Sequence, residues 1–417
     1  MAKISTSSGA NGLPIHRIEI PGTRATTILV AFDAGARTES AEENGMAHFL
    51  EHLVFKGGQI YDDYRKVNET AERMGGSLNA YTSHDLVAFH ITVRAESAVE
   101  AIDLLTDFVG RPKLDAEELN KERGVVIQEI QRYKDEPASV AGDLIERAGF
   151  GDHPLGRTVL GPEQHIESFS REAIVAFRER RWAGQRGGAF IVGNLEHVPT
   201  NGAVDEYFGR FPSLPDAPPS EAPVPFTPVT LVEERDSNQS HLRMLYQPDL
   251  DPSDASQRVA FGIYSTLLGG SMGSRLFDEI REQRGLAYSV FAMAHIASDY
   301  SALVLGAGLE SAKTVEAFTR MKEIVAELAT DGPTEEEVER ARAYVAGRRV
   351  LSFESTNSVA GYAAGRAIVH RESFDPDDAI AAIDAVTFDQ VAEAARRVNP
   401  EELSIACVGP HEYSEFS

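Results

Sequence analysis

The chain has 417 residues and carries 65 acidic against 40 basic side chains, a formal net charge of -25. Such a charge repels nucleic acid and anionic membranes and would draw basic peptides into an acidic cavity, although it can equally serve solubility alone. The length exceeds that of a usual single core, so we expect two domains. A single cysteine excludes an internal disulfide framework, and the lack of a long apolar run or an apolar leader predicts a cytoplasmic chain.

The first informative segment is HFLEH, which runs from His48 to His52. Residues four apart lie on the same face of an α-helix, so the two imidazoles can bind one metal ion together. Glu51 lies beside them and can reach a water molecule on the metal without being a ligand itself. The order H-x-x-E-H reverses the H-E-x-x-H order of many zinc peptidases. By itself the pattern also fits two surface histidines on an amphipathic helix.

The next segments predict two strands and two helices. Residues 75–109 run from a strand pair, with alternating apolar residues in LVAFHITV, into an amphipathic helix. Asp115 then provides a helix cap, and Glu122 and Glu129 follow within that helix. Because seven residues make two helical turns, these two carboxylates face the same way, and one can bind a metal while the other supports it. A solvated, charged helix is the simpler alternative.

A proline-rich linker, residues 211–230, separates a domain at 1–210 from a domain at 231–417. Residues 284–325 repeat the order of strand pair and amphipathic helix found at 75–109, which indicates a duplication. We therefore predict an α+β fold with two duplicated domains, each with a mainly antiparallel sheet and packed helices. Where the first half has AHFLEHLVF, the second has STLLGGSMG at 265–273, without histidine or glutamate. The fold thus does not require HFLEH for packing.

Together these segments resemble the pitrilysin-type zinc peptidases, which carry H-x-x-E-H and include insulin-degrading enzyme and the mitochondrial processing peptidases. Glu129 stands 77 positions after His52, and Glu122 stands seven before Glu129, as in that family. The segments GMAHFLEHLVFKG, GGSLNAYTSHD, HPLGRTVLG and LLGGSMGSRLFDEIREQRGLAYSV extend the resemblance over nearly the whole chain. The length is similar to that of the single-unit bacterial and processing-peptidase branch.

The resemblance implies a site with one zinc ion per chain. The implied zinc ligands are His48, His52 and Glu129, the catalytic base is Glu51, and Glu122 is a supporting acid. The implied activity is that of a zinc metalloendopeptidase that hydrolyses unfolded peptides or leader-like segments. The alternative is a non-catalytic partner or scaffold of the same fold, like the respiratory-complex core proteins.

Substrate binding in such enzymes uses an exposed strand edge. In the resembling enzymes a strand with the sequence Asn-Ala lies beside the metal and pairs with the substrate backbone, which here implies Asn79 and Ala80. An ordinary hairpin edge is the alternative reading of this strand.

The second half contributes Arg281 and Tyr288, which match an Arg/Tyr pair that the family uses to bind substrate and stabilise the oxyanion. Arg275 and Arg284 are close enough in sequence to be alternatives to Arg281. In the double-length relatives this pair faces the metal across a clam-shell chamber, of which the present chain would form one half. The resemblance therefore implies a homodimer with shared sites, or a heterodimer with an inactive sister chain.

Overall fold

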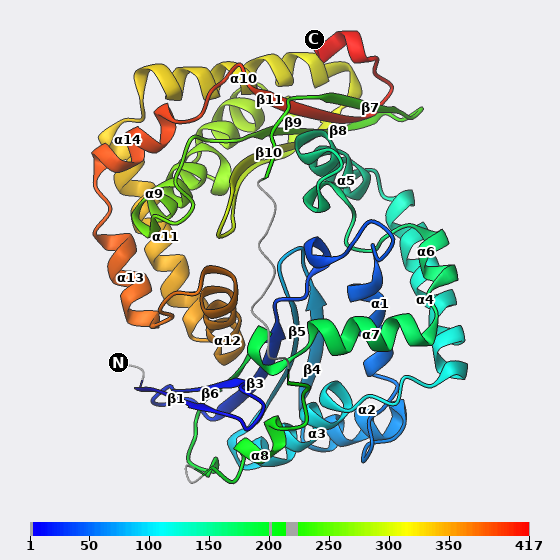
Figure 1. Ribbon diagram of the computed structural model, residues 1–417. Coiled ribbons are helices and arrows are strands. Elements are labelled where there is room, and N and C mark those ends of the chain that lie inside the picture. Colours follow the sequence, from blue (N-terminus) through cyan, green and yellow to red (C-terminus); the bar gives the residue numbers. More distant parts are fainter. Residues whose placement is uncertain (1–2, 200–201, 214–223, 417) are drawn as a thin grey trace. The chain divides into compact units, whose positions relative to one another are not determined.

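The structure is a computed structural model that describes residues 3–199, 202–213 and 224–416 (Figure 1). The chain folds into two compact units, each containing one β-sheet with packed helices, and most neighbouring strands are antiparallel. The predicted α+β class with two sheet-based domains is confirmed. Of the predicted linker at 211–230, residues 214–223 lie outside the described part of the chain.

The first unit comprises Met1–Ile130, Thr158–Glu221 and Leu351–Ala379. Its strands are β1 (Lys3–Ser8), β2 (Pro14–Glu19), β3 (Ala25–Phe32), β4 (Ser77–Thr82), β5 (Val87–Arg94) and β6 (Gly187–Gly193). Its helices are α1 (Met46–Val54), α2 (Tyr64–Arg73), α3 (Ala98–Gly110), α6 (Glu163–Ser168), α7 (Arg171–Arg181), α8 (Asp205–Phe208), α12 (Thr356–Ala364) and most of α4 (Ala116–Asp135).

The first sheet has six strands in the order β1-β2-β6-β3-β5-β4. The central strand β3 has the sequence ATTILVAF and is buried along almost its whole length, which suits its β-branched and apolar residues. One face of the sheet packs against α1, α3 and α7, and the other packs against α12. Among the described residues, strand β4 pairs with β5 alone and forms one edge of the sheet. The sheet therefore presents one face to α1 and a strand edge close to it.

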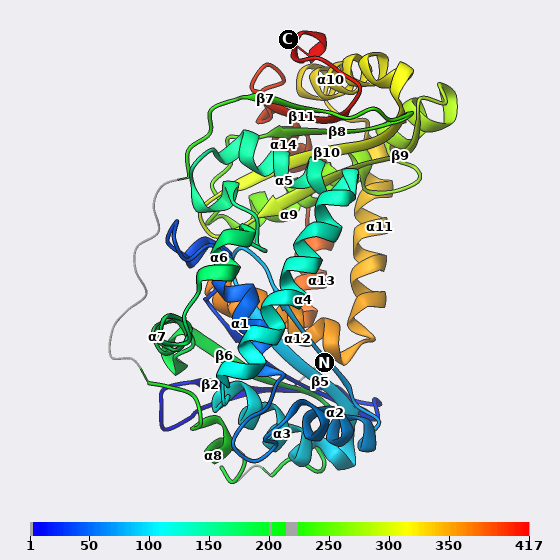
Figure 2. The same cartoon turned by 90° about the vertical axis from the view of Figure 1, so that its right-hand side faces the viewer.

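The second unit comprises Gln131–Arg157, Ala222–Val350 and Ile380–Ser417. Its strands are β7 (Thr230–Glu234), β8 (Gln239–Tyr246), β9 (Ala287–Ile296), β10 (Ser301–Glu310) and β11 (Leu403–Gly409). Its helices are α5 (Pro137–Phe150), α9 (Ala255–Ser265), α10 (Thr314–Asp331), α14 (Phe388–Arg396), most of α11 (Glu335–Phe353) and the last part of α13 (Pro376–Asp384). Figure 2 shows its strands between α10 and α5, and the apolar clusters on the two faces agree with that arrangement.

The two sheets share one topology. The second sheet has the order β7-β11-β8-β10-β9, which repeats β2-β6-β3-β5-β4 of the first strand for strand. The corresponding pairs β2–β6 and β7–β11 are parallel, and the other three pairs of neighbouring strands in each order are antiparallel. This agreement supports the duplication inferred from the sequence, and it makes β9 the counterpart of β4.

The units exchange helices across the middle of the sequence. Helix α5 precedes the proline-rich segment but packs on the second sheet, where Ile145 and Ala148 contact the cluster around Leu245. Helix α12 belongs to the second half of the sequence but covers the first sheet, with Val359 and Ala363 in its core. Both helices bury apolar faces that their own half of the chain does not cover. The predicted domains at 1–210 and 231–417 follow the sequence order and do not describe this exchange of α5 and α12.

Candidate metal centre

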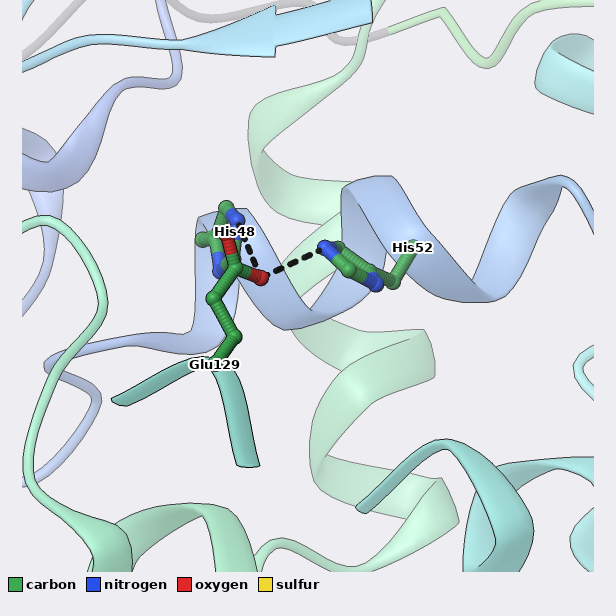
Figure 3. A group of neighbouring side chains, drawn as sticks. All are labelled: His48, His52 and Glu129. Carbon is green, nitrogen blue, oxygen red and sulfur yellow. Dashed lines mark ion pairs between the residues drawn. The ribbon is translucent and has the colours of Figure 1, made fainter. Parts of the chain in front are cut away.

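Helix α1 places His48 and His52 side by side. Its other face carries Phe49, Leu50 and Leu53, which are buried in the core of the first unit and fix the rotation of the helix about its axis. The two histidines are four residues apart, and their ring centroids lie 4.7 Å from each other (Figure 3). The structure thus brings the imidazoles together as the sequence spacing predicts.

Helix α4 brings Glu129 to these histidines. Its Val126 and Ile130 are buried in the same core, and Glu129 Oε2 lies 3.4 Å from His52 Nε2 and 3.8 Å from His48 Nε2 (Figure 3). Zinc bonds of about 2.0–2.1 Å in tetrahedral geometry separate neighbouring ligand atoms by about 3.4 Å. The three donor atoms lie within 4.8 Å of one another. Two imidazoles and one carboxylate at these separations fit a zinc ion that keeps a further position open.

The protonation of the histidines suits metal binding. Burial, together with the neighbouring His52, lowers the pKa of His48 to about 3, so its ring is neutral at physiological pH. Burial alone would lower the pKa of His52, but the carboxylates of Glu122, Glu129 and Glu51 outweigh it and raise that pKa. A metal ion bound by the three donor atoms and a proton on His52 compete for the same lone pair, that of Nε2.

Glu122 supports His52 from the side away from Glu129. One of its carboxylate oxygens, Oε1, lies 2.9 Å from His52 Nδ1, and its other oxygen lies 2.5 Å from Lys56 Nζ. An Nδ1–H that donates to Glu122 fixes the tautomer in which Nε2 carries a lone pair. The partners His52 and Lys56 lower the pKa of Glu122, although burial acts in the opposite direction.

Glu51 lies on α1 between the two histidines and contacts the first sheet. Thr82 donates a hydrogen bond from its hydroxyl to Glu51 Oε2 at 2.5 Å. Burial raises the pKa of the Glu51 carboxyl above its ordinary value, an effect that this hydrogen bond opposes. Thr82 is the last residue of β4, so the position of Glu51 is coupled to the edge strand.

Asn79 and Ala80 lie in the middle of β4. Their backbones pair with His90 and Phe89 of β5 on one side, and the opposite side of β4 has no strand partner within the described residues. The side chains along β4 alternate between exposed and half-buried, as expected for an edge strand with one face toward α1. The geometry suits the pairing of an extended peptide with β4.

Arg281 and Tyr288 both belong to the second unit. Arg281 lies in the π-helical turn η6 (Phe277–Gln283), and its guanidinium carbon is 6.0 Å from the centre of the Tyr288 ring at the start of β9. The Tyr288 side chain is 87% exposed and therefore accessible to a ligand. Arg275, by contrast, is engaged by Glu337 through bonds of 2.6 and 2.9 Å. The structure pairs Tyr288 with Arg281, and the role of both residues stays a prediction.

The second unit carries no equivalent of the metal donors at the matching place. After β8, which corresponds to β3, the chain forms α9 and the π-helical turn η5 (Thr266–Gly270), and neither contains histidine or glutamate. The one group of at least three potential metal ligands found among the described residues is that of His48, His52 and Glu129.

Two contacts at the site were not evident from the sequence. Thr82 reaches Glu51 across 31 positions, and Lys56 reaches Glu122 across 66. Neither residue belongs to a spacing pattern that predicts such a contact. Lys56, however, follows HFLEH by four positions, and Thr82 follows the Asn-Ala pair of the predicted substrate strand by two.

Comparison with known proteins places the chain in a family. Residues 16–163 match the family described as Insulinase (Peptidase family M16), and residues 168–345 match its partner domain, described as Peptidase M16 inactive domain. The chain belongs to peptidase family M16, in its single-unit form. This agrees with the resemblance drawn from the sequence motifs.

Relatives and solved structures extend this assignment over the full length. The chain is 30% identical to the uncharacterized zinc protease YmxG of Bacillus subtilis, over 96% of this chain and 97% of that protein. It is also 30% identical to an uncharacterized zinc protease of Mycobacterium leprae, over 96% and 90%. A crystal structure of a protease from Helicobacter pylori has the same fold, with a TM-score of 0.89 at 19% identity, covering 98% of this chain and 100% of that one. Within the described residues, no helix combines the length and apolar character needed to cross a membrane.

We predict that the purified chain binds one zinc ion and that each of His48→Ala, His52→Ala and Glu129→Gln weakens this binding. The two histidine changes remove a donor atom and Glu129→Gln replaces a charged carboxylate by a neutral amide, so the loss should exceed the roughly 10–100-fold that follows removal of an outer partner. Competition with a chromogenic chelator measures the affinity. As a control, His197→Ala removes an exposed histidine and should leave zinc binding unchanged. Wild-type affinity in any of the three ligand variants would contradict the assignment.

Proposed function

We propose that this chain is a zinc-dependent metalloendopeptidase that cuts unfolded peptides or leader-like segments. The observation that carries the proposal is the convergence of His48 Nε2, His52 Nε2 and Glu129 Oε2. Glu51 lies on α1, the helix that carries the two histidines. Membership of peptidase family M16 and the zinc protease names of the relatives support it. The cytoplasmic location stays a prediction.

The residues of the site divide the work of peptide hydrolysis. A bound zinc ion would supply Lewis acidity and lower the pKa of a water molecule towards about 7. Thr82 holds one oxygen of Glu51, and the other oxygen takes a proton from the attacking water and passes it to the leaving amine. Glu122 keeps His52 in the tautomer that presents Nε2 as a donor.

Substrate would bind as an added strand along β4, beside Asn79 and Ala80. Backbone pairing reads the extended shape of a peptide and not its side chains, so cleavage preference would be broad and set by side pockets. The net charge of -25 favours basic peptides. Folded proteins offer few free extended segments, which restricts the enzyme to unfolded chains.

The alternative, a non-catalytic scaffold of the same fold, fits the site less well. The partner-domain profile matches residues 168–345 and is described as inactive, and those residues include the counterpart of α1 without metal donors. The first unit, however, keeps His48, His52, Glu129 and Glu51 together. Pure binding or scaffolding needs no half-buried base next to the metal ligands.

Glu51→Gln should lower kcat by about 10²–10⁴-fold, because an amide cannot take the proton of the attacking water. Turnover of a fluorogenic unfolded peptide and the zinc content of the variant are the two measurements. Zinc should stay bound, since Glu51 is not a ligand. Glu43→Gln, which changes a glutamate just before α1 that pairs with Arg180, is the matched control and should retain activity. Loss of zinc together with activity would make Glu51 structural.

Thr82→Val should lower kcat by about tenfold with little change in KM, because it removes the donor that orients Glu51 while preserving the shape of the side chain. Thr82→Ser keeps the hydroxyl and should stay within a few-fold of wild type. Steady-state kinetics on the same peptide test both variants. Full kcat in Thr82→Val would show that the hydrogen bond does not position the base.

We further propose that two copies of the chain form a homodimer in which Arg281 and Tyr288 of each chain complete the site of the other. One chain carries both the metal ligands and the Arg/Tyr pair, which makes a homodimer with two sites the economical arrangement. The high exposure of Tyr288 is compatible with contact to a substrate held by a second chain. A heterodimer with an inactive sister chain is the alternative.

Mixing Glu51→Gln chains with Tyr288→Phe chains tests this arrangement. After subunit exchange about half of the dimers are mixed, and one of their two sites is intact, so about a quarter of wild-type activity should return. Each variant alone, carried through the same exchange, gives the baseline. Activity no higher than the sum of the separate variants, in samples shown to contain mixed dimers, would place each complete site within a single chain.

A further inference from the structure

Lys56 lies just beyond the end of α1, outside the H-x-x-E-H motif. Its Nζ is 2.5 Å from Glu122 Oε2, while Glu122 Oε1 is 2.9 Å from His52 Nδ1. Glu122 itself is only 4% exposed. A continuous chain of contacts therefore runs from Lys56 through Glu122 to a residue at the metal site.

This ion pair differs from the surface ion pairs of the chain. The Lys56 side chain is 26% exposed, whereas the other lysines whose ion pairs the structure describes have side-chain exposures from 34% to 81%. Surface ion pairs contribute little, but a buried carboxylate is costly unless it is paired and hydrogen-bonded. Lys56 supplies the positive charge that a buried Glu122 requires.

The ion pair with Lys56 also determines which carboxylate oxygen of Glu122 faces His52. Lys56 engages Oε2, so Oε1 stays directed at Nδ1 and acts as an acceptor. Without this cation, Oε2 of Glu122 loses its partner, and the side chain is no longer held with Oε1 against Nδ1. A His52 ring without that acceptor is not fixed in the orientation and tautomer that present the Nε2 lone pair to a metal ion.

We propose that Lys56 is a positioning residue for the metal site: by holding Oε2 of Glu122, it keeps Oε1 against His52 Nδ1 and so fixes the orientation of the His52 ring. The inference rests on the proposed zinc site and goes beyond it by assigning a role to a residue outside the H-x-x-E-H motif. The ion pair of Lys56 is with Glu122, which is not one of the three metal donors, so we expect Lys56 to act through Glu122.

Zinc affinity tests the proposal without reference to catalysis. Lys56→Met should bind zinc about 10–100-fold more weakly than wild type, the usual effect of losing an outer partner of a metal ligand. Lys56→Arg keeps the positive charge and should stay within a few-fold of wild type. Lys121→Met is the matched control: it removes a lysine of α4 that pairs on the surface with Glu117 and Glu118, and it should have no effect.

A double-mutant cycle separates this role from general stability. In a Glu122→Gln background, Lys56→Met should cause no further loss of zinc affinity, because its target is already gone. Thermal melting of the zinc-free variants identifies any that fail to fold, and Lys56→Arg then carries the comparison. Unchanged affinity in Lys56→Met, equal losses in the Met and Arg variants, or additive losses in the cycle would overturn the proposal. Absence of zinc binding in the wild type would instead refute the proposed function.

Discussion

The meeting of α1 and α4 is the constraint on which the site depends. Three carboxylates, those of Glu51, Glu122 and Glu129, are drawn close to two imidazoles at this meeting. Each carboxylate has a different partner: Thr82 for Glu51, Lys56 and His52 for Glu122, and the two Nε2 atoms for Glu129. Because partly buried carboxylates repel one another and are costly to desolvate, these separate partners give each one its own chemical role.

The duplicated fold explains how such a site can exist in one half of the chain only. Both sheets have the same strand order, and both end in an unpaired edge within the described residues, β4 in the first and β9 in the second. They differ in the helix that follows the central strand, since α1 carries His48 and His52 and α9 carries no metal donor. The sheet and its edge are therefore common to both copies, whereas the metal donors are present in one copy alone among the described residues.

The sequence predicts the local parts of this arrangement well. Residues four apart in HFLEH and seven apart in α4 share a helix face whatever the surroundings, so His48 with His52, and Glu122 with Glu129, could be placed from spacing alone. Which glutamate faces Nε2 and which faces Nδ1 depends on how the two helices cross. Spacing within a helix does not contain that information, and only the resemblance to a known family distinguished the two carboxylates.

Contacts between distant segments were beyond local reasoning for the same reason. The hydroxyl of Thr82 meets Glu51 because β4 lies at the sheet edge next to α1, and Lys56 meets Glu122 because α4 passes the end of α1. The exchange of α5 and α12 between the units is also a tertiary event, driven by apolar faces that need a sheet to cover them. Periodicity reveals those faces but not the sheet that receives them.

The central claim is that this chain cuts peptides with a metal held by His48, His52 and Glu129. The most direct test is to incubate the purified protein with a library of basic, neutral and acidic unfolded peptides, with and without a zinc chelator, and to identify the products by mass spectrometry. We expect cleavage that the chelator abolishes and that added zinc restores. Absence of chelator-sensitive cleavage across all three peptide classes would contradict it.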